Sequence, residues 1–416
     1  MTKRAILLAA ALTLAMPASG ETLREALAEA WVSNPALAAA RARQDALAEA
    51  PEQARAAGRL AAAASGGAGY DDLGYGRAAT GVVAATLPIW TGGRVPSAVR
   101  AASSDVAAGR ERLRDTEQAV LEQVVEVYAA LLFNQQSVEV ARVGIERLDR
   151  QVEEARARFG LGQSTLTDVA QLEAQRASVA ANLADGEGAL ATTQAAYRAI
   201  VGRAAGTLTA PADGTSPDLP RTLDDARGAA AASNPLLLAQ RRALGASAAR
   251  IDAARAEGAP ALDASGGYGR GTRIGDAGGG FPFAGNAGLT LRIPLLTGGF
   301  VGSRVREARA NWRADRFAVD AAGREAERGT DAAWAALTAA RTRLEAGIAG
   351  LKAADLALRG VRAEYGFGLR TTVDILIADQ SYRGAQLDVA RARADVLVAH
   401  AGVLRAIGRL TLAAYP

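Results

Sequence analysis

Two short runs of glycine, hydroxyl and acidic residues recur in this chain 206 positions apart. The first lies within residues 158–175, and it is followed by a helical pattern just as the second is. Glycine can take the positive φ of a tight turn, while a threonine three residues before an aspartate can cap the next helix. The matching residues are Gly160, Gly162, Thr165 and Asp168 in the first run and Gly366, Gly368, Thr371 and Asp374 in the second. We therefore expect two sharp helical hairpin tips.

The chain offers little for catalysis. It has one histidine, His400, and no cysteine. None of the common signatures for zinc hydrolysis, phosphate binding or a serine nucleophile is present. The carboxylates are scattered at helical spacing among arginines, which is typical of solvated helix faces. We interpret His400 as a packed or surface residue of a helix, and we expect no enzyme, no cofactor and no metal site.

The charge balance and the N-terminus indicate the compartment. The chain carries 48 basic and 44 acidic residues, which are interspersed, so we expect no nucleic-acid binding. Residues 1–20 combine Lys3 and Arg4, an apolar core and a small-residue site ending at Gly20, which predicts a signal peptide. A buried N-terminal helix is the alternative. The mature chain would begin near Glu21, outside the cytoplasm, and no later stretch is long and apolar enough to be a transmembrane helix.

Most of the mature chain is duplicated, which predicts an internal two-fold repeat. Ser33-Asn34-Pro35 recurs at 233–235, and the run 87–93 recurs in related form at 293–299. Apolar residues three, four or seven apart predict long coiled-coil-like helices, each beside two shorter helices stacked end to end. The expected first repeat, 21–202, holds a β-hairpin at 60–90, a long helix at 94–158, a tip at 159–164 and a return helix at 165–201. After a linker at 203–221, the second repeat, 222–416, holds a β-hairpin at 260–295, a long helix at 300–365, a tip at 366–370 and a return helix at 371–407.

The four strand-length segments allow two interpretations. Eight to eleven residues suit a tilted membrane-spanning strand, but the period-2 alternation is faint in the first hairpin and clearer only over 289–293. Exposed hairpins on a soluble helical protein are the alternative. An open sheet of four strands cannot face lipid, because its edge N–H and C=O groups would be unsatisfied. A membrane location therefore requires several chains, and three would supply a twelve-stranded barrel around water.

The two tips and the duplicated plan resemble the TolC-type outer-membrane exit ducts of tripartite drug efflux and type I secretion. The resemblance covers essentially the whole mature chain. It implies a mixed, mainly α-helical fold: a homotrimer with a twelve-stranded outer-membrane β-barrel, four strands per chain, continued by a long helical barrel in the periplasm. It also implies a periplasmic adaptor, an inner-membrane transporter of the ABC or RND type and outer-membrane lipid as partners. The alternative is a secreted, soluble coiled-coil scaffold or adhesin without a pore.

The resemblance also implies roles for individual residues at the tips. The periplasmic gate would be held by Arg370, Asp168, Thr167 and Tyr365, with Arg370 donating hydrogen bonds to Asp168. The pore constriction would be lined by Asp374, and Ile377 takes the place of a second acidic ring. The adaptor would dock on Gly160, Gly162, Gln163, Gly368 and Leu369. The alternatives are a solvated charge for Arg370 and a helix cap for Asp374.

Overall fold

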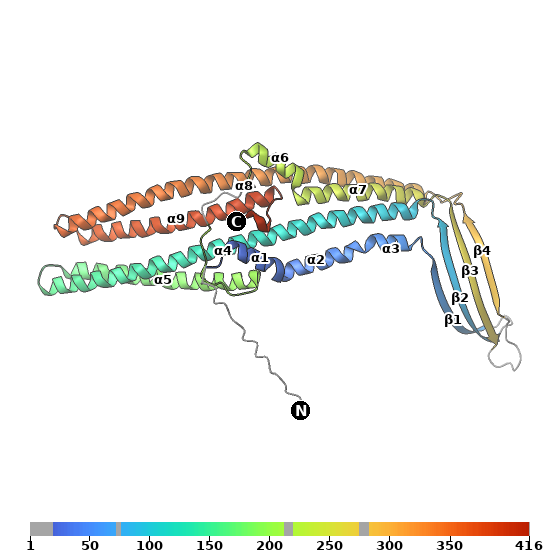
Figure 1. Ribbon diagram of the computed structural model, residues 1–416, viewed down its shortest axis with the longest axis horizontal. Coiled ribbons are helices and arrows are strands. Elements are labelled where there is room, and N and C mark those ends of the chain that lie inside the picture. Colours follow the sequence, from blue (N-terminus) through green and yellow to red (C-terminus); the bar gives the residue numbers. More distant parts are fainter. Residues whose placement is uncertain (1–19, 72–75, 212–218, 274–282, 416) are drawn as a thin grey trace, which may run out of the picture.

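The computed structural model describes residues 20–71, 76–211, 219–273 and 283–415. The chain is a long rod with a β-sheet at one end and two helical hairpins at the other (Figure 1). The expected signal peptide lies outside the described residues except for Gly20, and so does the part of the linker at 212–218. Helices predominate, and the rod is wide only at its middle, where several short segments gather.

Four antiparallel strands form the sheet, in the order β1-β2-β3-β4. The strands are β1 (Ala61–Asp71), β2 (Gly76–Trp90), β3 (Ala261–Arg273) and β4 (Ala284–Arg292). The register between β2 and β3 shifts between Pro88 and Trp90, because proline has no N–H to give to the ladder. Strands from the two halves of the sequence thus lie side by side, and β1 and β4 form the two edges.

Two helices of 67 residues each run the length of the rod: α4 (Arg94–Gly160) and α8 (Phe300–Gly366). Each turns at the tip into a return helix, α5 (Leu166–Val201) or α9 (Thr372–Ala406). At the turns only Gly162 and Gly368 take positive φ, at 70° and 74°. The expectation for Gly160 is wrong in this detail, since Gly160 is the last residue of α4 and needs no left-handed conformation.

Shorter helices complete the two remaining columns of the rod. They are α2 (Pro35–Ala48) with α3 (Ala50–Ala56) in one column, and α7 (Pro235–Ala256) in the other. Asn34 joins α2 to α5 because its Oδ1 accepts from Ala36 N at 2.9 Å while its Nδ2 donates to Ile200 O at 2.9 Å. Asn234 does the same for α7 and α9 through Leu237 N and Ala406 O. The Ser-Asn-Pro repeats thus align short helices end to end.

The main hydrophobic core lies at the middle of the rod. There α1 (Leu23–Ser33) packs on α4 and α5, α6 (Leu223–Ser233) packs on α8 and α7, and the C-terminal turn η1 (Leu412–Ala414) packs on α1. Tyr128 and Tyr197 are fully buried, and the Glu21 carboxylate accepts hydrogen bonds from the Tyr197 hydroxyl and from Arg203 Nη2 at 2.7 Å. Burial, together with the nearby Glu21 charge, raises the pKa of both tyrosines.

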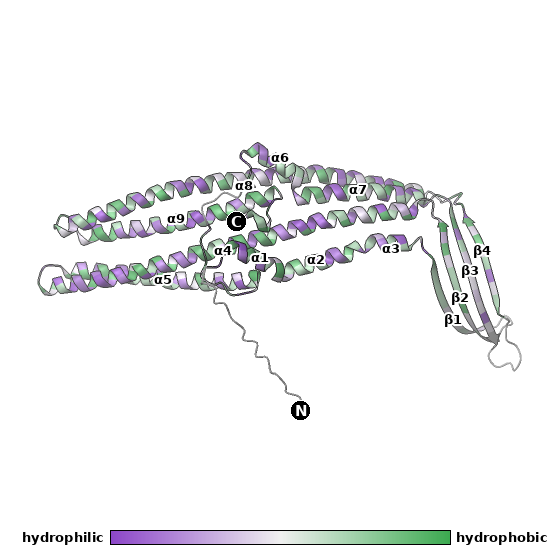
Figure 2. Cartoon of the chain, in the orientation of Figure 1, coloured by the Kyte–Doolittle hydropathy of each residue, from purple (hydrophilic) through white to green (hydrophobic). Residues whose placement is uncertain are grey.

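Burial is uneven among the helix columns. In the half near the sheet α3, α4, α7 and α8 adjoin in that order, and in the tip half the order is α5, α4, α9 and α8. The central α4 buries 20 residues, whereas α8, of equal length, buries 5. Hydrophilic residues recur along both hairpins (Figure 2). In the described part of the chain no helix is both long and apolar enough to cross a membrane.

Candidate functional site

The first tip is a capped turn. Thr165 is the N-cap of α5: its Oγ1 accepts from Asp168 N at 3.1 Å, and its own N donates to Asp168 Oδ2 at 3.0 Å. Ser164 Oγ also donates to Asp168, at 3.2 Å. The backbone and hydroxyl of Thr165, followed by Ser164, hold the pKa of Asp168 below its usual value. The capping role expected for Thr165 and Asp168 is thus present.

The second tip repeats this geometry. Thr371 caps α9, and its N and Oγ1 both donate to Asp374 Oδ2 at 2.9 Å. These hydrogen bonds lower the pKa of Asp374, with a smaller contribution from the charge of Arg370. Asp374 therefore makes the helix cap that was the alternative to a pore role. Capping does not exclude a pore role, because the hydrogen bonds that Asp374 accepts in the cap use only one of its two carboxylate oxygens, Oδ2.

Arg370 differs from the gate predicted from the resemblance. Its Nε donates to Glu364 Oε2 at 2.6 Å, and this carboxylate raises the pKa of Arg370. Glu364 lies on the same tip, so Arg370 reaches it without crossing to the other hairpin. The predicted pair of Arg370 with Asp168 is therefore not formed within the chain, because each side chain is engaged on its own tip. Thr167, another of the predicted gate residues, is exposed.

One pair of side chains does join the tips. Arg158 of α4 lies over the ring of Tyr365 of α8, with its guanidinium carbon 5.6 Å from the ring centroid and its Nη1 3.4 Å from the hydroxyl. The side chain of Thr372, at the start of α9, makes a small contribution to the low pKa of Asp168. Tyr365 thus connects the two hairpins through Arg158, and the gate roles expected for Asp168, Thr167, Tyr365 and Arg370 stay predictions.

Arg158 and Glu364 were missed by the sequence reasoning. They occupy equivalent positions in the two tip runs, 206 residues apart, and they carry opposite charges. That reversal between otherwise matched runs was the available signal, because it means that the two tips cannot use the position in the same way.

The tips present apolar surface to solvent. Leu161 and Phe367, which follow the last residues of α4 and α8, are 74% and 83% exposed, and Leu369 is 74% exposed. Gly160, Gly162, Gln163 and Gly368, the other residues predicted to dock an adaptor, are also exposed. Exposed large apolar residues gathered at one end of a chain are typical of a protein-interaction surface.

The sheet has one apolar and one polar face. Residues opposite each other in the register share a face, and alternate residues change face. One face carries Val83, Leu87, Leu262, Tyr268, Leu289 and Leu291. The other carries Thr86, Asp263, Ser265, Asn286 and Thr290. Every residue of β4 is exposed, and Leu289 is 69% exposed, so none of the described residues covers the apolar face along β4.

Comparison with known proteins decides the family. The chain matches the outer membrane efflux protein family over residues 26–203 and 226–409. The chain belongs to this family. It is 33% identical to the outer membrane efflux protein BepC of Brucella suis over 318 residues, 75% of this chain and 68% of BepC. It is 28% identical to the outer membrane protein TolC of Vibrio cholerae over 334 residues, 74% of this chain and 73% of TolC.

The fold has solved relatives. The outer membrane protein VceC of Vibrio cholerae has a TM-score of 0.75 and 22% sequence identity, with 93% of this chain and 96% of VceC covered. This outer membrane efflux protein is therefore an exit duct for efflux or type I secretion that lies in the outer membrane and extends into the periplasm. The soluble scaffold considered from the sequence is not supported. Among the described residues, no group of histidine, aspartate or glutamate side chains could hold a metal ion.

Proposed function

We propose that three copies of this outer membrane efflux protein form one continuous duct, with a β-barrel in the membrane and a helical tunnel beneath it. The sheet is the observation that carries the proposal. Within the described residues its two edges have no partner strand, and its apolar face is exposed along β4. Unpaired edges and an apolar face are both stable when the sheet closes with other copies inside lipid.

The number of copies follows from the width of the barrel. Each chain supplies 4 strands. Two copies would give a barrel of about eight strands, whose interior is filled by side chains or one small ligand. Three copies are the smallest set that leaves a water-filled passage, with the polar face lining it. The helices extend this ring along the rod, because each strand is joined in sequence to one helix column of the half near the sheet.

The tips form the periplasmic gate. The contact between Arg158 and Tyr365 links the two hairpins of one chain. Arg370, Thr167 and Asp374 lie at the same end and would face neighbouring copies or the axis. Exposed contacts of this type each stabilise a conformation by only about 0–1 kcal/mol. A partner that binds the tips can therefore open them.

The partners are a periplasmic adaptor and an inner-membrane transporter. The exposed apolar residues at the tips, with Gln163 and Leu369 between them, give an adaptor a surface to bind. In this arrangement the transporter supplies the energy and selects the cargo, and the duct conducts it passively.

The proposal is tested on the purified mature protein in detergent. Light scattering should give the mass of three copies, and addition to a planar lipid bilayer should give stepwise ion conductance. A monomer that stays soluble without detergent would overturn the proposal, as would a trimer that never conducts after the tips are loosened by substitution.

A further inference from the structure

We infer that neighbouring copies are joined by a ladder of three ion pairs between α8 of one copy and the α2–α3 column of the next. The pairs are Arg306 with Glu52, Arg309 with Glu49 and Arg313 with Asp45, the second residue of each pair being contributed by the neighbouring copy. The inference rests on the proposed function, because it needs copies arranged edge to edge. It names the residues that select a second copy of this chain as the partner.

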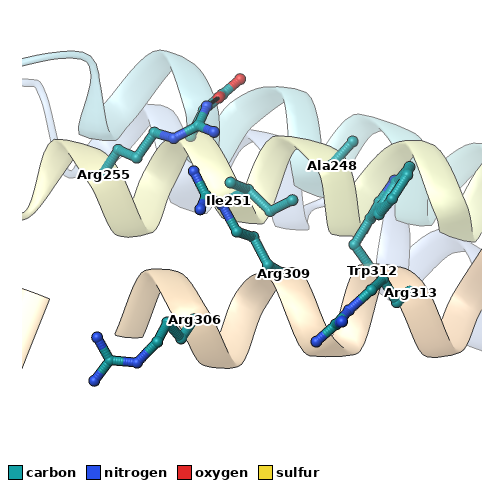
Figure 3. A pocket seen from close by; sticks show the side chains of 8 residues that line it. Ala248, Ile251, Arg255, Arg306, Arg309, Trp312 and Arg313 are labelled. Carbon is teal, nitrogen blue, oxygen red and sulfur yellow. Dashed lines mark hydrogen bonds and ion pairs between the residues drawn. The ribbon is translucent and has the colours of Figure 1, made fainter. Parts of the chain in front are cut away.

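The three arginines are exposed, and no acidic side chain of the described residues pairs with them. Across the described residues, neither Arg306, Arg309 nor Arg313 forms an ion pair, whereas Arg304 on the other flank of α8 pairs with Glu257 and Glu307. The three arginines are spaced three and four apart, so they share one face of the helix. They line a groove between α7 and α8 together with Arg255 and Trp312. Figure 3 shows Arg309 reaching toward α7 while Arg306 points away from it.

The acidic residues have the matching spacing. Counted away from the sheet, Glu52, Glu49 and Asp45 follow one another at steps of three and four, the same steps as the arginines. All three are exposed, and Glu52 pairs only with Arg55 and Arg59 of its own helix end. The two helix columns also begin at the same height above the sheet. Gly58 lies against Val95 at the sheet end of one pair of columns, and Gly258 lies against Val301 at the sheet end of the other. The equal steps along the two helix columns therefore place each acid opposite one arginine.

An ion pair inside the chain provides the template. Arg100 of α4 pairs with Asp252 of α7 at 3.3 Å, where the long helix of one repeat adjoins the short column of the next. The sequence offsets of 206 for the long helices and 200 for the short columns convert Arg100 to Arg306 and Asp252 to Glu52. The boundary between α8 of one copy and α3 of the next copy would likewise join a long helix to the short column of the following repeat. Arg306 and Glu52 should therefore meet as Arg100 and Asp252 do.

The two sets also lie on one side of the helical wall. Asp252 and Arg306 line the same groove. Glu52 is the repeat equivalent of Asp252, so it lies on that side as well. Within one chain the two sets cannot meet, since α2–α3 and α8 are the outer columns with α4 and α7 between them (Figure 1). The charges are therefore complementary only between copies.

The test is a double-mutant cycle on the full mature protein in detergent, read as the temperature at which the trimer dissociates. Arg306→Glu should lower this temperature in the wild-type background, because it faces Glu52. In the Glu52→Arg background the same change should raise it. Arg304→Glu is the matched control, with the same charge change on the opposite flank, and it should not recover stability in the Glu52→Arg background.

A covalent test is independent of charge. The chain has no cysteine. Gly245 lies close to Ser104 inside the chain, and their repeat equivalents are Asp45 and Ala310. A variant with Asp45→Cys and Ala310→Cys should form disulfide-linked multimers on oxidation, and neither single variant should form the same series of linked bands. A trimer that shows the same Arg306→Glu effect in both backgrounds, with no linked multimers, would overturn the ladder while the duct remains. A wild-type protein that is monomeric would overturn the proposed function itself.

Discussion

Arg158 of the first hairpin covers the ring of Tyr365 of the second, so a cation–π contact and a hydrogen bond meet at one pair of side chains. Arg158 also pairs with Glu154 one turn earlier in α4. This acid positions the guanidinium without leaving the helix. The tip end of the rod thus has one contact that spans the hairpins and one that only supports it, and the two can be separated by substitution.

Removing the spanning contact should favour the open gate. Arg158→Ala is expected to raise the open-to-closed ratio up to about fivefold, since an exposed cation–π contact contributes roughly 0.5–1 kcal/mol. Single-channel conductance in planar bilayers measures the change. Arg156→Ala is the control, because Arg156 pairs with Glu173 inside the first hairpin. Equal conductance for wild type and Arg158→Ala would remove this contact from the gate.

The charge of Asp374 can be tested apart from its cap. Asp374→Asn keeps a side-chain oxygen that can accept from the Thr371 N–H in the capping box, but it removes the negative charge. Three such charges around an axis would attract cations, so block by multivalent cations from the periplasmic side should weaken. Asp168→Asn makes the same change at the equivalent position of the other tip. If the two variants are blocked alike, Asp374 does not line the constriction.

The sequence predicted the elements better than the contacts. Gly93, Gly299 and the Ser-Asn-Pro runs set element ends by local backbone chemistry, and the helices and strands do begin or end close to them. The partner of Arg370 could not be predicted in this way. Glu364 and Asp168 are both acids near the tips, and only the folded turn shows that Glu364 is within reach. The polar and apolar faces of the sheet likewise became clear only from the register, because many strand residues are alanine or glycine.

Glu21 should be the most sensitive polar residue of the middle core. It is 7% exposed and receives hydrogen bonds from Tyr197, Arg203 and Gly206 N. Glu21→Ala leaves these donors without their acceptor and is expected to cost about 3 kcal/mol of stability. Glu25→Ala removes only an exposed capping-box contact and should cost roughly 1 kcal/mol. Thermal unfolding of both variants gives the comparison, and equal losses would mean that the Glu21 network contributes no more than a cap.

His400 should make the periplasmic part less stable in mild acid. It is 6% exposed, its Nδ1 lies 3.4 Å from the Tyr415 hydroxyl, and burial, with a smaller effect of Arg341, lowers its pKa to about 4. The unfolded chain binds a proton near pH 6.5, whereas the folded chain does so only near pH 4, so stability is full above about pH 6.5 and falls between these values.

The size of this loss is on the order of 3 kcal/mol, because each pKa unit corresponds to about 1.4 kcal/mol. His400→Gln should remove the step, since glutamine does not titrate and is close to histidine in size. Unfolding temperature measured from pH 7.5 to pH 4 would show the difference as a steeper decline in the wild type. His400 is the only histidine of the chain, so a decline that persists unchanged in His400→Gln must come from carboxylates, and burial of the imidazole would then have no part in it.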